Sequence, residues 1–321
     1  MTEANLQEDQ STLIKRPELL ITAGSIEEVK RYLDAGADAV QIGDAAYAER
    51  LPGSIHGEAI GQAVQYAHQH GAKVYAVVNK IIDHTLLSGL GDYLQTLIDY
   101  GVDALVFGDP AVWMTLRERN LQVKLHWTAE MTTTNYRTAN YWASKGSART
   151  ILSRELNMQE IADFKKNAVT EVQIQVHGMT NIYHSKRRLV EHYLTYQGRK
   201  LQPVRDAGKI MYLIEKERPD ERFPIIETEH GTHIMSSDDI CMLECLDEIL
   251  PLGLDSFYIE SLLKTPLYNE TVLRMYRKAI DAWCADPDSY ELEEEWLDEI
   301  YELQDPEREL SFGFLFKELV Y

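Results

Sequence analysis

The chain has 321 residues, 45% of them hydrophobic, and a formal net charge of −20; this size fits one large α/β domain or two ordinary ones. It contains no run of 18 or more apolar residues, so no membrane span is expected, and its polar, acidic start argues against a secretory signal. Three cysteines argue against a disulfide framework and for a reducing compartment, which predicts a cytoplasmic protein.

The predicted elements alternate regularly along the chain after a lead-in, residues 1–17, that is expected to be disordered. Eight short apolar stretches have the pattern of buried strands. They are residues 19–23, 39–43, 73–79, 104–108, 123–127, 150–153, 171–177 and 255–260. A helical pattern follows each stretch. These helices are expected from Ser25 to near Gly36, over 57–71, up to Gly101, from Pro110, and over 133–146, 158–167, 239–252 and 266–283.

Local signals support the helix boundaries. Ser25 and Glu28 resemble a capping box, and Pro110 suits a first helical turn, where its missing N–H costs little. Several of the helices end in a glycine just before the next strand, which is expected C-cap chemistry.

Eight strands, each followed by a helix, predict an α/β fold of the (β/α)8 TIM-barrel type over residues 18–285. A doubly wound open sheet is the less favoured alternative. A long insertion after the seventh strand, residues 179–237, is too long for one loop and is expected to lie over the barrel mouth. Residues 286–321 form an acidic C-terminal extension, in which apolar residues at helical spacing predict an amphipathic helix packed on the barrel. They are Leu292, Trp296, Ile300 and Leu303.

The seventh strand carries a particularly informative stretch, residues 171–188. Val172, Ile174 and Val176 alternate with glutamines, and the strand is expected to end at His177-Gly178, where glycine permits a sharp change of direction. A polar run follows. Taken alone, this is an ordinary strand and a solvated turn, and only its place in a barrel gives it weight.

Polar residues are expected at the carboxyl ends of the strands, which form the active-site face of a barrel. They are Asp44, Asn79, Asp109, His126, Glu130, Arg154, Glu155, His177 and Glu260. Such a ring could hold general acids and bases or bind a polar small molecule. Each residue alone has a structural explanation; Asp109, for example, precedes Pro110 and could simply cap a helix.

No metal site is predicted, because neither HExxH nor a cysteine pair with zinc spacing occurs. No GxSxG elbow or glycine-rich phosphate loop occurs either. Cys241 and Cys245 are four residues apart on a predicted helix and are interpreted as buried core residues.

The charge is distributed unevenly. Residues 286–309 hold twelve acidic side chains against one basic, whereas residues 184–210 hold seven basic side chains against two acidic. In the stretch 181–212, basic residues are interleaved with four tyrosines. Cationic side chains hold phosphates and aromatic faces stack on unpaired bases, so RNA binding and a solvated amphipathic helix are about equally favoured there.

The sequence IQVHGMTNIYHSKRRL at 174–189 resembles the signature region of peptidase family U-32, the collagenase-like proteases. Further segments agree in order, at 125–135, 152–161, 233–243, 253–261 and 307–316. The resemblance covers nearly the whole chain, is specific in combination, and is nearest to a short bacterial branch. It implies a TIM-type barrel with a C-terminal extension.

The resemblance also implies more than one activity. Some members of the family are described as proteases, without an agreed catalytic machinery, and others act in oxygen-independent hydroxylation. The nearest branch resembles the tRNA hydroxylation proteins, which make 5-hydroxyuridine at the wobble position and use prephenate as a co-substrate. tRNA is therefore an expected partner and prephenate a possible co-substrate, whereas DNA and membranes are not expected partners.

Departures from the family pattern concern its iron–sulfur cluster. At two positions where cluster-bearing relatives have cysteine, this sequence has Asn181 and Arg188, and of four expected cysteines only Cys241 remains. A cubane cluster normally needs four thiolates, so no cluster is expected. The family's Glu-Gly-Arg motif reads Glu260-Ser261-Leu262, which removes an arginine from the mouth. A cysteine-bearing paralogue is therefore an expected partner.

Three functions remain open: a tRNA-hydroxylation subunit, a collagenase-like peptidase, and a non-catalytic partner of a cysteine-bearing paralogue. Glu260 matches the family's glutamate and is expected to point across the mouth toward His177 as a paired acid and base. The predicted catalytic residues are Glu260, His177, Glu155 and Glu130. The predicted substrate-binding residues are Asn79, Asp109, His126, Arg154 and Asn181. The predicted RNA-binding residues are Lys186, Arg187 and Arg188.

Overall fold

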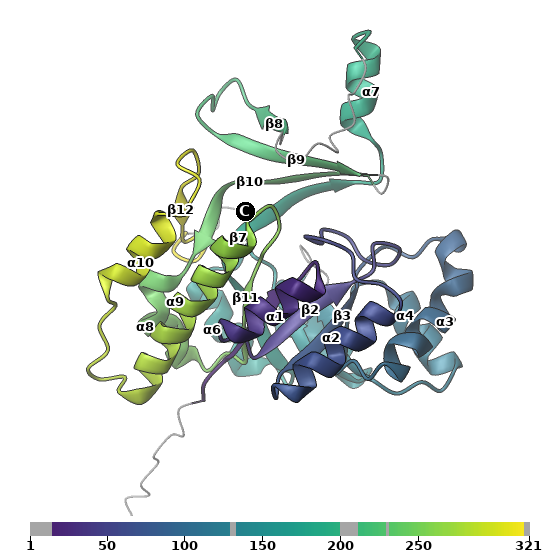
Figure 1. The fold of residues 1–321 in the computed structure, drawn as a ribbon, viewed down its shortest axis with the longest axis horizontal. Helices are drawn as coiled ribbons and strands as arrows, with labels where there is room; N and C mark the ends of the chain where they lie inside the picture. The colour runs from purple at the N-terminus through teal and green to yellow at the C-terminus, as the bar shows by residue number, and fades with distance from the viewer. Residues whose placement is uncertain (1–14, 129–132, 200–210, 229–230, 318–321) are drawn as a thin grey trace, which may run out of the picture.

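The computed structural model describes residues 15–128, 133–199, 211–228 and 231–317. Within them, eight parallel strands close into a barrel (Figure 1). The strands are β1 (Glu18–Thr22), β2 (Ala39–Gly43), β3 (Lys73–Val78), β4 (Ala104–Phe107), β5 (Lys124–Thr128), β6 (Ser147–Ile151), β7 (Glu171–Ser185) and β11 (Ser256–Ile259). β11 pairs with both β1 and β7, which closes the sheet. The TIM-type barrel is therefore confirmed and the open sheet is excluded.

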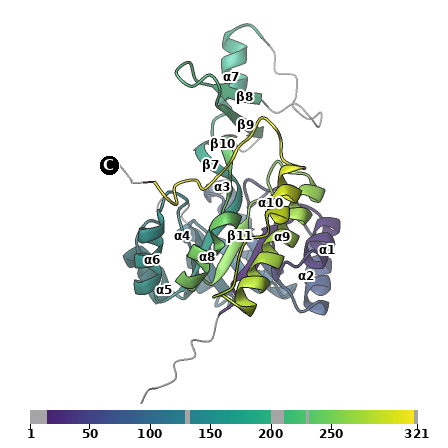
Figure 2. The same cartoon turned by 90° about the vertical axis from the view of Figure 1, so that its left-hand side faces the viewer.

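Helices surround the barrel (Figures 1 and 2). They are α1 (Ile26–Asp34), α2 (Glu58–Gln69), α3 (His84–Asp99), α4 (Pro110–Glu118), α5 (Tyr136–Ser144), α6 (Met158–Asn167) and α9 (Pro266–Ala285). Their starts follow the sequence signals: Ser25 caps α1, Asp109 caps α4 with Pro110 in its first turn, and Asn157 with Glu160 forms a capping box on α6. Among the described helices, none is both long and apolar enough to cross a membrane.

The core lies in two layers, because the side chains of each strand alternate between the inside of the barrel and the surrounding helices. The outer layer is the larger and includes Leu19, Ile21 and Val40 with the helix residues Tyr32 and Tyr276. The inner layer is a smaller cluster. It contains Leu20, Ala39, Tyr75, Val77, Ala104, Val106 and Tyr258. Inward-pointing positions above this cluster are polar, and they form the mouth.

The insertion is a sheet that continues the barrel wall, with α7 (Leu189–Tyr196), β8 (Met211–Ile214), β9 (Arg222–Thr228) and β10 (Gly231–Cys241). Its strand order is β7-β10-β9-β8, with antiparallel pairing. The predicted end of the seventh strand at His177 is wrong, because β7 runs on to Ser185. Residues 179–185, which have the polar composition of a loop, pair with β10, more than 45 positions away in the sequence. The insertion stands above the barrel in Figures 1 and 2.

The helix predicted over 239–252 is confirmed only from residue 243 onward, and its predicted start is wrong. β10 runs to Cys241 because Asp239, Ile240 and Cys241 pair with β7. Three short helical segments follow without a gap: η2 (Leu243–Cys245), α8 (Leu246–Ile249) and η3 (Leu250–Leu252). Cys241 thus ends a strand and Cys245 ends a 3-10 turn, so the two do not share one face of a helix.

The acidic extension packs against the outside of the barrel through α10 (Glu294–Tyr301), where Trp296 and Ile300 are buried as predicted. A short strand, β12 (Leu310–Ser311), pairs with β10. Asp239 anchors this end, because its buried carboxylate binds Lys264 and Arg308. Burial alone would raise the pKa of Asp239, but the two cations lower it to about 2.

Candidate active site at the barrel mouth

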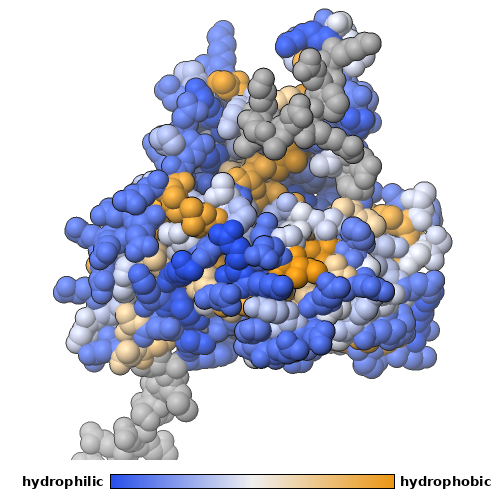
Figure 3. Space-filling model, in the orientation of Figure 1, coloured by the Kyte–Doolittle hydropathy of each residue, from blue (hydrophilic) through white to orange (hydrophobic). Residues whose placement is uncertain are grey.

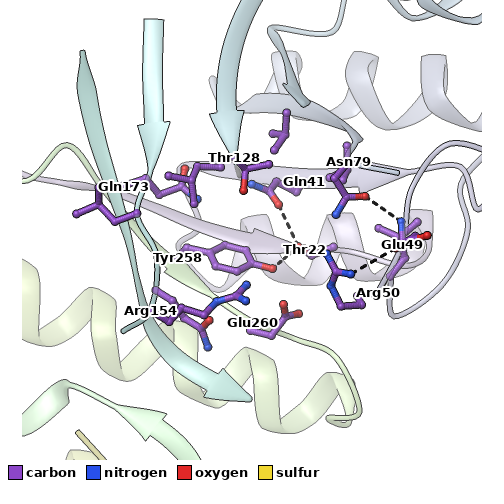
Figure 4. Close-up of a pocket in the computed structure, with 16 residues that line it drawn as sticks. Thr22, Gln41, Glu49, Arg50, Asn79, Thr128, Arg154, Gln173, Tyr258 and Glu260 are labelled. Carbon is purple, nitrogen blue, oxygen red and sulfur yellow. Dashed lines mark hydrogen bonds and ion pairs between the residues drawn. The ribbon is translucent and has the colours of Figure 1, made fainter. Parts of the chain in front are cut away.

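A polar cavity opens at the carboxyl ends of the strands (Figure 4), with an empty volume of about 580 Å³ that includes solvent at its entrance. Inward-pointing residues of the strands form it, since every second residue of a barrel strand faces the interior. They include Thr22, Gln41, Thr128, Gln173, Gln175 and Tyr258. The walls are completed by Glu49, Arg50, Asn79, Arg154 and Glu260 from the strand ends and the following loops.

The floor of the cavity is fixed by hydrogen bonds. The hydroxyls of Thr22 and Tyr258 lie 2.8 Å apart, and Thr22 also donates to the Gln41 amide oxygen at 3.4 Å. The Gln175 amide donates to three successive backbone carbonyls of β7, at 3.0 to 3.2 Å. These contacts pre-position the floor, so a ligand meets a rigid surface of oxygen and nitrogen atoms.

Two arginines and two glutamates give the cavity its charge. Arg50 follows β2, and its guanidinium lies 3.5 Å from the Glu49 carboxylate, while Asn79 accepts a hydrogen bond from the Glu49 amide at 2.9 Å. Figure 4 shows Glu260 between Arg154 and Arg50. Burial lowers the pKa of Arg50 to about 10, and the nearby positive charge of Arg154 adds to this effect. The cavity thus holds two cationic and two anionic side chains, so both the acidic and the basic groups of a ligand would find a partner of opposite charge.

Glu260 is one of two buried carboxylates that line the cavity; it is 7% exposed and Glu49 is 6% exposed. Burial raises its pKa, and the charges of Arg154 and Arg50 and the Leu262 amide, which donates to it at 3.1 Å, partly offset the effect. A carboxyl group with a raised pKa can give up or accept a proton nearer to neutral pH than an exposed one. Glu260 therefore lies where the sequence predicted it, in contact with the cavity.

The predicted pairing of Glu260 with His177 is wrong. The β7–β11 register shifts between Tyr258 and Ile259, so Tyr258 faces Gln175 but Ile259 faces His177. This bulge turns the His177 ring to the outside of the barrel, where Nε2 lies 2.8 Å from the hydroxyl of Tyr268 on α9. The ring is fully buried, and burial lowers its pKa to about 3. His177 is thus a neutral core residue.

Two further expectations also fail in the structure. His126 points into the barrel but one layer below the mouth, in register with Arg149 and 4.6 Å from the ring of Tyr75. β5 continues to Thr128, which takes the mouth position that was predicted for His126. Asp109 has a structural role, because its carboxylate accepts from the backbone amides of Ala111 and Ile82, both at 2.9 Å.

A smaller cavity of about 330 Å³ adjoins the first and shares Thr128 and Arg154 with it. Glu155, Thr180 and Asn181 also line it. Arg154 therefore lies between Glu155 and Asn181 in this cavity and Asn79 and Glu260 in the first one. Asn181 is 4% exposed, and its amide nitrogen and oxygen have no hydrogen-bond partner among the described residues. Glu130 lies outside the described residues.

The predicted RNA-binding residues Lys186, Arg187 and Arg188 are exposed where the extension of β7 ends and α7 begins. Lys186 lies 3.7 Å from Asp83 at the start of α3, and Arg188 pairs with Glu191 at 2.7 Å. Nearby tyrosines are exposed as well, namely Tyr183, Tyr193 and Tyr196. A cationic and aromatic surface therefore borders the mouth.

The cysteines do not fit an iron–sulfur cluster. The chain has three, and all lie among the described residues. Cys241 is buried beside the Tyr276 hydroxyl, and burial raises the pKa of its thiol to about 11, which disfavours the thiolate that a cluster needs. Asn181 and Arg188 offer no thiolate. The absence of a cluster remains a prediction.

Sequence reasoning missed several cavity residues, above all Glu49, Arg50 and Tyr258. A signal did exist for Gln173 and Gln175, since polar residues at alternate positions of a strand that is buried on both faces must point into the barrel. Glu49 and Arg50 carry no such signal, because they follow β2 in a loop whose position depends on contacts with Asn79.

Comparison with known proteins gives a consistent result. The model of the family "Peptidase family U32" matches residues 24–319. The chain is 46% identical over 310 residues to the Bacillus subtilis "tRNA hydroxylation protein P2", covering 96% of this chain and 100% of the relative. It is 30% identical to "tRNA hydroxylation protein P1" of the same organism and 29% identical to "tRNA hydroxylation protein P" of Haemophilus influenzae, covering 90% and 83% of this chain and 68% of each relative.

Proposed function

The chain belongs to peptidase family U32, and from this membership we propose that it is a component of tRNA wobble-uridine 5-hydroxylation. The observation that carries the proposal is the 46% identity to tRNA hydroxylation protein P2 over the full length of that relative. Identity at this level and coverage is typical of proteins with one fold and a closely related role.

The cavity supports a small anionic co-substrate. Arg50 and Arg154 both line this cavity, together with two acidic residues, Glu260 and Glu49, the latter 3.5 Å from Arg50. A ligand carboxylate beside either guanidinium would gain charge-assisted hydrogen bonds. Prephenate carries two carboxylates, so we propose that it binds here, with Asn79 and the floor residues contacting its polar groups and Asn181 and Glu155 lining the adjoining cavity.

Glu260 is proposed as the residue that moves a proton during the reaction. It is enclosed, its pKa is raised by burial, and it shares the cavity with the Tyr258 hydroxyl. Arg154 would orient the ligand toward it. This assignment keeps Glu260 in the catalytic role and leaves His177 outside it.

The tRNA is proposed to contact Lys186, Arg187 and Arg188, with the exposed tyrosines stacking on unpaired bases of the anticodon loop. These residues border the mouth, so the RNA would cover the entrance to the cavity. The relatives named P1 and P2 come from one organism, which supports the proposal that this chain works with a cysteine-bearing paralogue.

The peptidase alternative has less support. The described residues that line the main cavity include neither serine nor cysteine, so they offer none of the usual nucleophiles apart from two threonines, Thr22 and Thr128. Thr22 already contacts Gln41 and Tyr258 through its hydroxyl, and no histidine in the described part of the chain lines the cavity to act as its base.

Nucleoside mass spectrometry of tRNA from a deletion strain tests the proposal. We expect 5-hydroxyuridine derivatives at the wobble position to fall in the deletion strain and to return when the gene is restored. If a paralogue acts redundantly, the double deletion should show the loss. Unchanged modification in both strains would overturn the proposal, and gelatin cleavage by the purified protein would favour the peptidase alternative.

A further inference from the structure

Three potential metal ligands meet where the insertion joins the barrel. The ligand atoms of Glu49, His184 and His233 all lie within 4.8 Å of one another. Glu49 comes from the loop after β2, His184 from the extended part of β7, and His233 from β10. His184 and His233 are direct partners in the β7–β10 ladder, and their rings stack at 4.4 Å with an angle of 4° between them.

The backbone holds this cluster in place. Strand pairing fixes the two histidines, and the Asn79 side chain accepts a hydrogen bond from the Glu49 amide. Glu49 and His233 are buried, and the His184 side chain is 16% exposed. The site is thus assembled by the fold from residues that are far apart in the sequence, which explains why no ligand spacing pattern marks it.

Interactions within the cluster leave one oxygen of the Glu49 carboxylate without a hydrogen-bond partner among the described residues. Glu49 Oε2 lies 3.5 Å from His184 Nε2, a distance too long for a good hydrogen bond, and 3.5 Å from Arg50. Glu49 Oε1 is buried and has no hydrogen-bond partner among the described residues. An unsatisfied buried carboxylate oxygen is costly, and a bound cation would remove that cost.

We propose that Glu49, His184 and His233 form a binding site for a divalent transition-metal ion. Two imidazoles and one carboxylate, with further positions open to water or substrate, are a donor set that suits Zn²⁺ and Fe²⁺. Ligands about 2.1 Å from one ion lie about 3.4 Å apart. Binding therefore draws the side chains together and tilts the stacked rings, so that both lone pairs point at the ion.

The ion would join the barrel to the insertion, and it would lie beside the polar cavity and a second, mostly apolar cavity. Glu49 lines the polar cavity, and Glu49 and His233 both line a neighbouring cavity of about 710 Å³. Apolar residues form most of the latter, including Leu51, Ile226 and Leu262. Figure 3 shows apolar surface in this region, where the insertion meets the barrel. Arg50 and His184 Nε2 both lie 3.5 Å from Glu49 Oε2, so a cation bound by the cluster would compete with the Glu49–Arg50 ion pair.

The test uses the full-length protein without a histidine tag, stripped of metal by a chelator and dialysed. Co²⁺ is titrated by absorption spectroscopy and Zn²⁺ by calorimetry. We expect one equivalent of each and a rise in melting temperature. His184→Asn, His233→Asn and Glu49→Gln should each weaken binding by about 100-fold or more, since changes even outside the ligand set cost about 10- to 100-fold. His192→Asn, an exposed histidine on α7, is the matched control and should bind as wild type.

A second measurement uses the wild-type protein, so its result does not depend on whether the variants fold. Zn²⁺ should protect His184 from acylation by diethylpyrocarbonate, read by mass spectrometry, and should leave His192 reactive. The proposal is overturned if the wild-type protein binds less than about half an equivalent, or if the folded His184→Asn, His233→Asn double variant binds like wild type. Equal reactivity of His184 with and without Zn²⁺ would overturn it too.

Discussion

The Glu260 amide donates a hydrogen bond to the His177 carbonyl at 2.9 Å, yet the two side chains lie on opposite sides of the barrel wall. Glu260 faces the polar cavity, and His177 contacts Tyr268 and Tyr276 on α9. A single bulge between neighbouring strands thus separates a residue with a proposed catalytic role from one that supports the core.

The first prediction follows from this separation. Glu260→Gln removes a buried charge but keeps the side-chain size and an acceptor for the Leu262 amide. We expect a folded protein, with a melting temperature close to wild type, that fails to restore wobble hydroxylation in a deletion strain. His177→Gln is the matched control and should restore it. Full restoration by Glu260→Gln would remove Glu260 from the catalytic role.

The second prediction concerns stability at acidic pH. The pKa of His177 is lowered from 6.5 to about 3, chiefly by burial. Below pH 6.5 the unfolded chain therefore gains a proton that the folded protein cannot accept until about pH 3, so stability falls as pH falls. The slope from this residue approaches about 1.4 kcal/mol per pH unit.

Urea unfolding at pH 7, 6 and 5 measures this slope. The free energy of unfolding of His177→Gln should depend on pH less steeply than that of wild type, by up to that amount. His192→Gln, whose ring is exposed, should keep the wild-type dependence. Parallel curves for wild type and His177→Gln would show that His177 titrates normally in the folded protein.

The third prediction concerns ligand charge. Arg154→Gln should weaken binding of prephenate about 10- to 100-fold, because a charge-assisted hydrogen bond contributes about 1.5 to 3 kcal/mol and about 1.4 kcal/mol corresponds to a tenfold change in affinity. Calorimetry measures the affinity. Arg117→Gln, on the exposed side of α4, should have no effect. Wild-type affinity in Arg154→Gln would place the ligand elsewhere.

The fourth prediction concerns the cofactor of cluster-bearing relatives. Protein purified without oxygen should contain no acid-labile sulfide and show no visible charge-transfer band, since Cys241 alone remains of the four cysteines expected to hold a cluster. Sulfide is the better assay than iron, because a mononuclear ion at Glu49, His184 and His233 would also contribute iron. Stoichiometric sulfide in the isolated chain would contradict this prediction.

The fifth prediction concerns the basic segment. Alanine at Lys186, Arg187 and Arg188 together should weaken tRNA binding and flatten its dependence on salt by about 0.7 to 0.9 in the log–log slope for each phosphate that the variant no longer neutralises. Arg188 and Lys186 also pair with acidic residues in the free protein, so the full change for three phosphates is an upper bound. Arg274→Ala on α9 is the control, and an unchanged slope in the triple variant would exclude this segment from the RNA interface.

The barrel itself could be predicted from the sequence, because each strand and helix carries local signals in its apolar pattern and caps. Asn79, Arg154 and Glu260 could be placed at the mouth for the same reason. The orientation of His177 could not, since a bulge depends on the register with β11 and not on the residues of β7. His126 was misplaced because the end of β5 was predicted one residue too early.

The insertion shows the same limit. Residues 179–185 have no apolar alternation, and their strand conformation comes from pairing with β10. Asp239 to Cys241 resemble a helix start in sequence, but long-range pairing with β7 and β12 decides their conformation. Contacts between distant segments also create the cluster of Glu49, His184 and His233, which no local pattern reveals.

The continuity of β7 has a consequence for motion. Fifteen residues run without a break from the barrel wall into the insertion, and β10 pairs with β7 from Ser185 back to His177. An insertion joined by loops could open and close while the barrel stayed rigid. Here, separating the insertion would break hydrogen bonds of the same ladder that borders the mouth, so the two parts share one opening equilibrium. A ligand that stabilised the insertion would therefore also stabilise the mouth.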